Sequence, residues 1–97
     1  MAKGYWINMF HSVKDPAKVE AYRNLAGPAM QAAGAKFLVR GMPSKTYELG
    51  MMERVVVIEF ESVEKAIATH DSPGYQEALR VLGDAAERDI RILEGVA

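Results

Sequence analysis

The chain has 97 residues and a formal net charge of −1, with 49% apolar and 26% charged residues. This length and composition predict one soluble domain, residues 1–97, with a single modest core. Because the charge is balanced and no basic run occurs, we expect no general attraction to nucleic acid or to an anionic membrane surface.

Cysteine is absent, which excludes disulfides, a thiolate nucleophile and a zinc site of the cysteine type. No apolar run approaches the roughly 20 residues that a membrane-spanning helix needs. The first residues also lack the apolar segment of a signal peptide. We therefore expect a cytoplasmic protein.

The N-terminal third predicts a strand followed by a helix. Residues 4–10 form the expected strand, and residues 11–14 a loop. Asp15 and Pro16 then suit the start of a helix, because the aspartate accepts hydrogen bonds from free N–H groups and proline fits the first turn. Apolar residues continue at helical spacing, with a kink or short break expected at Gly27-Pro28.

The middle of the chain predicts a second strand over residues 36–40, with Phe37 and Val39 on one face and Leu38 on the other. Residues 45–50 contain threonine, tyrosine and leucine, and they are compatible with a short edge strand.

The C-terminal half predicts a third strand over residues 53–60 and a helix capped by Ser62. Ser72 and Pro73 restart the helix in a new direction, and the isoleucines and leucine of residues 90–93 carry the last strand. The order β-α-β-β-α-β predicts an α+β, ferredoxin-like sandwich, in which one antiparallel sheet carries its helices on one face.

The third strand has no polar side, since Val55–Ile58 places large apolar groups on consecutive positions and neighbouring strand residues point to opposite faces. The helices can cover only one face of the sheet. An open face of four short strands covers about 300 Å², and monomers seldom expose an apolar patch of that size. We therefore expect a homodimer, a bound ligand, or both to cover it.

Motifs along almost the whole chain resemble a known bacterial family. They are Gly4-Tyr5-Trp6-Ile7, Gly27-Pro28-Ala29, Gly34–Gly41, Arg54–Phe60, Ser72–Gln76 and Glu94-Gly95-Val96. The family is the domain of unknown function thirteen-thirty, of the dimeric α/β-barrel superfamily. The resemblance implies a ferredoxin-like fold and a dimer whose two sheets form one barrel.

The resemblance implies no particular activity. Relatives in the superfamily include cofactor-free monooxygenases, isomerases, haem enzymes and plain binding proteins. This chain also departs from the family pattern, for example at Met42, Glu61 and Leu82. We therefore carry no ligand preference over from the family.

The barrel interior is the expected place for a ligand. The resemblance implies the strand phase, because relatives tend to keep apolar groups at the even-numbered positions of the first strand. We therefore expect the odd-numbered residues Tyr5, Ile7, Met9 and His11 to face the barrel interior, together with the odd-numbered residues of Val55–Glu59. The even-numbered residues of both strands would then lie under the helices.

Glu59 is the best catalytic candidate, because apolar neighbours on a central strand would keep its carboxyl group from full solvation. Removal from water favours the uncharged form of a carboxyl group, which suits a general acid or base near neutral pH. The alternative, which we favour, is an ion pair with Lys36, Arg40 or Arg54 that fixes an interface.

Arg40 could bind a carboxylate or enolate through its planar fork, or it could lie at a dimer seam. His11 lies in a predicted loop and His70 on the apolar side of a helix, where a histidine is most often packed or capping. The candidate ligand-binding residues are Tyr5, Met9, His11, Arg40, Arg54, Glu59 and His70.

The two histidines lie far apart and predict neither a metal site nor a haem ligand, so we expect no cofactor. Three functions remain open. The first is a dimer that binds a small organic molecule between its sheets. The second is a cofactor-free enzyme, monooxygenase- or isomerase-like, acting on a small organic acid or aromatic compound. The third is a structural or regulatory dimer with a filled barrel.

Overall fold

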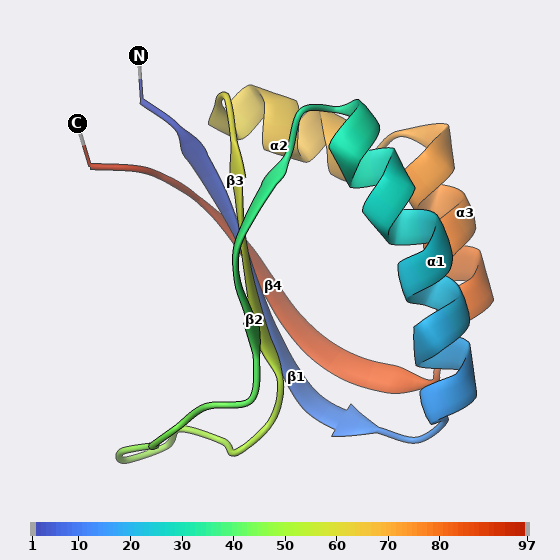
Figure 1. Cartoon of the computed structure of the whole chain (residues 1–97), viewed down its shortest axis with the longest axis vertical. Coiled ribbons are helices and arrows are strands. Elements are labelled where there is room, and N and C mark those ends of the chain that lie inside the picture. The colour runs from blue at the N-terminus through green and yellow to red at the C-terminus, as the bar shows by residue number, and fades with distance from the viewer. Residues whose placement is uncertain (1, 97) are drawn as a thin grey trace.

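The computed structural model describes residues 2–96. The elements in chain order are β1 (Gly4–Val13), α1 (Pro16–Ala32), β2 (Lys36–Gly41), β3 (Val55–Phe60), α2 (Val63–His70), α3 (Pro73–Leu82) and β4 (Ala86–Glu94). The strands form one antiparallel sheet in the order β2-β3-β1-β4. All the helices pack on one face and leave the other bare (Figure 1). The predicted ferredoxin-like α+β fold is confirmed.

The helices begin where the sequence predicts. The Asp15 carboxylate accepts hydrogen bonds from the backbone N–H groups of Ala17 and Lys18, at 3.1 and 3.3 Å. Ser62 and Ser72 cap α2 and α3 in the same way through their hydroxyl groups. In each case a short polar side chain satisfies N–H groups that have no partner inside the helix. None of the helices within residues 2–96 is long and apolar enough to span a membrane.

The break predicted at Gly27-Pro28 is wrong, because α1 runs through both residues without interruption. Pro28 removes one backbone hydrogen bond, but its side chain is exposed, so the ring disturbs no packing. Ala26 and Met30 on either side are buried against the sheet. Their packing stabilises the helix on both sides of the proline.

Two further strand predictions need correction. β1 does not end at Phe10 but continues to Val13, because the register shifts between Phe10 and Ser12 and the strand goes on pairing with β4. His11 therefore lies in a bulge of the strand rather than in a loop. Residues 45–50 form no strand in the structure.

The predicted facing of the side chains of β2 also needs correction, and this correction matters most for the site. Phe37 lies opposite Ile58, but Val39 lies opposite Val57, so Leu38 is the extra residue of a β-bulge. Phe37 and Val39 consequently face opposite sides of the sheet, contrary to the prediction. Arg40, opposite Val56, joins Phe37 on the helix side.

The predicted alternation of β1 and β3 is confirmed, with the even-numbered residues buried beneath the helices. The core centres on Trp6 and Tyr75, both 0% exposed, whose rings meet edge to face with their centroids 5.0 Å apart. The odd-numbered residues remain partly exposed on the bare face.

Alanine substitutions at two glycines should change the stability of the fold in opposite directions. Gly27 lies in the middle of α1, and a Cβ there would meet no atom within 4 Å. Gly27→Ala should raise the free energy of unfolding by about 0.5–1 kcal/mol, since glycine loses more backbone entropy in a helix. Thermal denaturation at fixed protein concentration should show a higher midpoint.

Gly4→Ala is the matched control, because a Cβ on Gly4 would lie only 2.5 Å from the backbone of Ser62. This substitution should lower the free energy of unfolding by about 1–3 kcal/mol. A Gly27→Ala variant no more stable than the wild type would contradict this account of α1.

Candidate functional site

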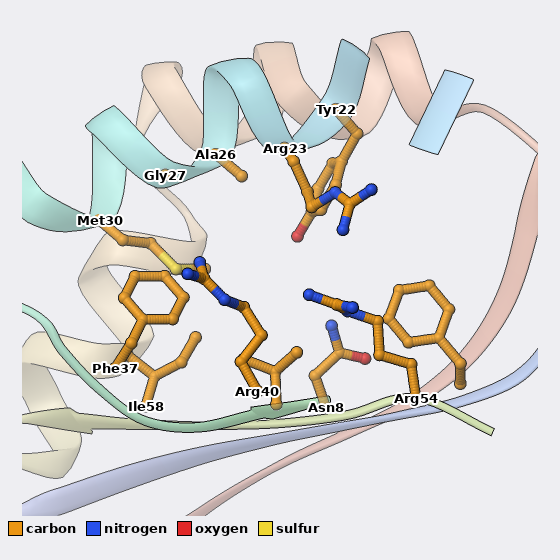
Figure 2. A pocket seen from close by; sticks show the side chains of 12 residues that line it. Asn8, Tyr22, Arg23, Ala26, Gly27, Met30, Phe37, Arg40, Arg54 and Ile58 are labelled. Carbon is orange, nitrogen blue, oxygen red and sulfur yellow. The ribbon is translucent and has the colours of Figure 1, made fainter. Parts of the chain in front are cut away.

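A pocket of about 70 Å³ lies between α1 and the edge of the sheet formed by β2 and β3. Met30, Phe37 and Ile58 line one end, where the Arg40 guanidinium group also lies, and Arg23, Arg54 and Asn8 line the more polar other end (Figure 2). The bulge at Leu38 turns the side chains of Phe37 and Arg40 toward this pocket. The local irregularity of β2 thus builds one wall of the pocket.

Three arginines from three segments line the pocket, namely Arg23 of α1, Arg40 of β2 and Arg54 just before β3. The guanidinium group of Arg40 lies over the ring of Phe37, 5.3 Å from its centroid. Arg23 and Arg54 reach toward each other from the helix and from the sheet (Figure 2). The pocket therefore concentrates positive charge beside an apolar wall.

The arginines are poorly neutralised. Arg23 forms an ion pair with Glu20, but Arg40 and Arg54 take part in no ion pair among residues 2–96. Burial, and then the charges of Arg23 and Arg40, lower the pKa of Arg54 from its ordinary value. Arginine nevertheless stays protonated at neutral pH, so the like charges repel one another across the pocket.

Asn8 forms part of the pocket floor and is only 5% exposed. Its Oδ1 atom is buried and has no hydrogen-bond partner within the described part of the chain. Leaving such a group unpaired costs about 1–3 kcal/mol. Figure 2 shows the Asn8 amide directly below the Arg54 guanidinium group, so a polar group that lacks a partner lies beside the unpaired charges.

Tyr22 closes the polar end of the pocket, and Tyr75 and Arg88 contact it on the side of the core. Its hydroxyl group lies 2.7 Å from that of Tyr75 and accepts a hydrogen bond from Arg88 at 3.0 Å. Arg88 also lies over the ring of Tyr22, 4.8 Å from the centroid. These contacts fix Tyr22 between the pocket and the core.

The sequence predictions placed the ligand on the bare face of the sheet, and some of the named residues do lie there. Tyr5 and Glu59 are directly opposite on β1 and β3, and the Tyr5 hydroxyl donates a hydrogen bond to Glu59 Oε2 at 3.0 Å. This bond to the carboxylate raises the pKa of Tyr5. Lys36 lies opposite Glu59 on the other side, but no ion pair joins them.

The expected ion pair of Glu59 with Arg40 or Arg54 is wrong for this chain, because the two arginines line the pocket on the helix side of the sheet. Strand phase explains the error, because Arg40 and Val56 share the helix side, whereas Glu59 lies on the other. A place for Arg40 at a dimer seam stays a prediction.

Met9 and His11 line a second, shallower hollow of about 540 Å³ on the bare face. Part of its wall is the loop between β2 and β3, which extends beyond the sheet away from the helices (Figure 1). Asp89 and Arg91 also line it, joined by hydrogen bonds of 3.0 and 3.1 Å. Tyr5 and Glu59 do not belong to this hollow.

His70 lies apart from both sites. Its ring packs 5.5 Å from Trp6 and 5.1 Å from Tyr75 between centroids, and its Nδ1 atom is 3.0 Å from Asp71 Oδ1. His70 therefore packs against the aromatic core, and it also lines a separate hollow with Ile67 and Ile90. No group of histidines and carboxylates within residues 2–96 is arranged to hold a metal ion.

Sequence reasoning missed Asn8, Tyr22 and Arg23 as pocket residues. Asn8 carried a usable signal, because it is the one polar residue between Trp6 and Phe10 on the helix-facing side of β1. Arg23 carried none, since an arginine on an amphipathic helix is ordinarily solvated.

The family model described as "Domain of unknown function (DUF1330)" matches residues 3–96. The chain belongs to this family. The resemblance found in the sequence is thereby confirmed. No match exists among curated proteins.

Solved structures share the fold. A protein of unknown function from Rhodopseudomonas palustris aligns with a TM-score of 0.75 and 17% identity over 99% of this chain and 84% of that one. A NIPSNAP family protein of unknown function from Agrobacterium tumefaciens gives 0.60 and 16%, over 97% and 88%. SnoaB, a cofactor-independent oxygenase from Streptomyces nogalater, gives 0.65 and 13%, over 100% and 96%.

The buried Tyr75 behind the pocket should make the stability of the fold depend on pH. Burial, with Tyr22 beside it, raises the pKa of Tyr75. The folded chain therefore keeps this phenol protonated at a pH where the unfolded chain, with a tyrosine pKa of about 10, releases the proton. The resulting stability is present below about pH 10 and declines as the pH rises further.

Urea denaturation from neutral to alkaline pH should show this decline, and Tyr75→Phe should make it shallower because it removes the titrating group. Tyr47→Phe is the control, since Tyr47 is 76% exposed. Equal alkaline slopes for the wild type and Tyr75→Phe would contradict the assignment.

Proposed function

We propose that the protein binds a small organic molecule in the pocket beneath α1, with Arg23, Arg40, Arg54 and Asn8 as ligand-binding residues. One observation carries the proposal: two arginines without acidic partners, Arg40 and Arg54, and a buried amide oxygen without a hydrogen-bond partner meet at one cavity with an apolar wall. Small-molecule sites combine an apolar lining with a few convergent polar groups in this way.

A purely structural role explains the pocket less well. A structural arginine is normally stabilised by a carboxylate or by backbone acceptors, whereas Arg40 and Arg54 have no side-chain acceptor among the described residues. Like charges held together without a counter-ion destabilise the folded chain. A ligand that supplies the missing acceptors would remove this destabilisation.

Binding is favoured over acid–base catalysis by the composition of the pocket. Neither a carboxylate nor a histidine lines it within residues 2–96, and the Tyr22 hydroxyl is engaged by Tyr75 and Arg88. Glu59, the predicted catalytic residue, lies on the opposite face of the sheet. The oxygenase activity of SnoaB, a protein with the same fold, keeps a cofactor-free enzyme as the second candidate.

A variant that fills the pocket tests the proposal. Ala26 is 4% exposed and lines the cavity, so Ala26→Leu should occupy much of its volume. In a library screen by NMR, compounds that bind the wild type should shift the amide signals of Asn8, Tyr22 and Arg54. They should lose most of their affinity, about tenfold or more, for the filled variant.

Ala32→Leu, at an exposed position of the same helix, is the matched control and should bind like the wild type. Compounds that shift only Tyr5 and His11 would place the site on the bare face instead, as the sequence suggested. That outcome would refute the pocket as the binding site.

We also propose that the bare face joins two copies into a homodimer. Exposed apolar side chains gather on this face and on its loop, among them Val39, Leu93, Met51 and Met52, each about half exposed. A stable interface buries about 800 Å² per subunit. A second copy would also enclose the hollow beside Met9 and His11, where the sequence predicted a ligand between the sheets. A cytoplasmic location remains a prediction.

Val57→Lys tests the dimer, because Val57 lies in the middle of the bare face. A charge buried at the seam should weaken association by about 3–5 kcal/mol and yield monomers in analytical ultracentrifugation. Val96→Lys, at a fully exposed position, is the control. A folded dimer of Val57→Lys with undiminished affinity would contradict the proposed interface.

A further inference from the structure

We infer that the ligand of the pocket is a small carboxylic acid with an apolar body, whose carboxylate lies between Arg23 and Arg54 and whose body faces Met30, Phe37 and Ile58. The inference rests on the proposed function, namely that the pocket binds a small molecule. It adds the chemical class of that molecule and the direction in which it lies.

The positive charges at the polar end of the pocket favour an anionic group on the ligand. The Arg23 and Arg54 side chains come from opposite walls and reach toward each other, with the Asn8 amide beneath (Figure 2). The guanidinium group presents a planar fork of donors that matches the two oxygens of a carboxylate. An anion between the two forks would replace their repulsion by attraction on both sides. The Asn8 Nδ2 group can donate a further hydrogen bond to the anion, whereas Asn8 Oδ1, the atom without a partner, only accepts and would need a donor instead.

Glu20, the acidic partner of Arg23, neutralises part of this charge. It lies one turn earlier on α1, 2.5 Å from Arg23, and its charge partly offsets the lowering of the pKa of Arg54 by burial, but its 61% exposure weakens these interactions through solvent screening. Glu20 also does not line the pocket. The positive charge that faces the interior of the pocket therefore exceeds what the chain itself neutralises.

The side chains at the other end of the pocket favour an apolar group on the ligand. Phe37 and Ile58 pair across β2 and β3, and Met30 covers them from α1. The Arg40 guanidinium group lies over the Phe37 ring, 5.3 Å from its centroid, which leaves the other end of the pocket to Arg23 and Arg54. A fully hydrophilic anion such as phosphate would leave these apolar side chains without contact.

The volume limits the size of the enclosed part. A water molecule needs about 10–15 Å³ measured in the same way, so about 70 Å³ has room for a carboxylate and a short body of a few carbons. An aromatic ring or a longer chain would extend toward the mouth. Short aliphatic acids and simple aromatic acids are the class that fits.

The experiment compares acids with their uncharged amides. Benzoate and butyrate, with benzamide, butyramide and inorganic phosphate, are titrated into the wild type at neutral pH and constant ionic strength. Binding is followed by the NMR amide signals of Asn8, Tyr22 and Arg54. Each acid should bind at least about tenfold more tightly than its amide and than phosphate, which corresponds to about 1.4 kcal/mol.

Arg54→Gln and Arg23→Gln should each weaken the acids by about tenfold or more and leave the amides unchanged. Arg80→Gln, which removes an exposed arginine of α3 paired with Glu77, is the control for general electrostatics and should change neither.

Each alternative result has its own meaning. Amides that bind as tightly as acids would overturn the anionic class and leave the pocket as a binding site. Phosphate that binds as tightly as the acids would overturn the apolar body. If the acids shift no pocket signal while other compounds do, the carboxylic acid is wrong and the proposed function stands. If no compound shifts these signals, both proposals are wrong.

Discussion

The structure depends on the alternation of side chains along the two central strands. Even-numbered residues of β1 and β3 form the core beneath the helices, and odd-numbered residues form the bare face. Trp6, Ile58 and Phe60 anchor the first set with almost no exposure. A slip of one residue in either strand would exchange the two sets, so burial of this core fixes which polar residues reach the pocket.

The sequence predicted the fold well because the signals for it are local and strong. Consecutive β-branched residues marked β3, and aspartate and serine caps marked the helix starts. These features depend on a few neighbouring residues, and the tertiary structure agrees with each of them. The phase of β1 followed instead from the family resemblance, since relatives tend to keep apolar groups at the even-numbered positions.

The site was predicted less well because it depends on registers and distances between distant segments. Arg40 and Arg54 were named as candidates and line the pocket, but the bulge at Leu38 that turns Arg40 toward α1 leaves no mark in the sequence. The long connection between β2 and β3 left the pairing of those strands open. Arg23 becomes part of a site only because α1 crosses above Arg54.

The support of Tyr22 bears on how such a pocket can change during evolution. Tyr22 is tied to Tyr75 and Arg88, and Tyr75 packs on Trp6 at the centre of the core. A substitution at this wall would disturb the whole molecule. Phe37 instead lies on the edge strand β2 and is only partly buried, so a change there disturbs less of the core. Descendants of one ancestor could therefore diversify the body of the molecule they hold while retaining its charged head.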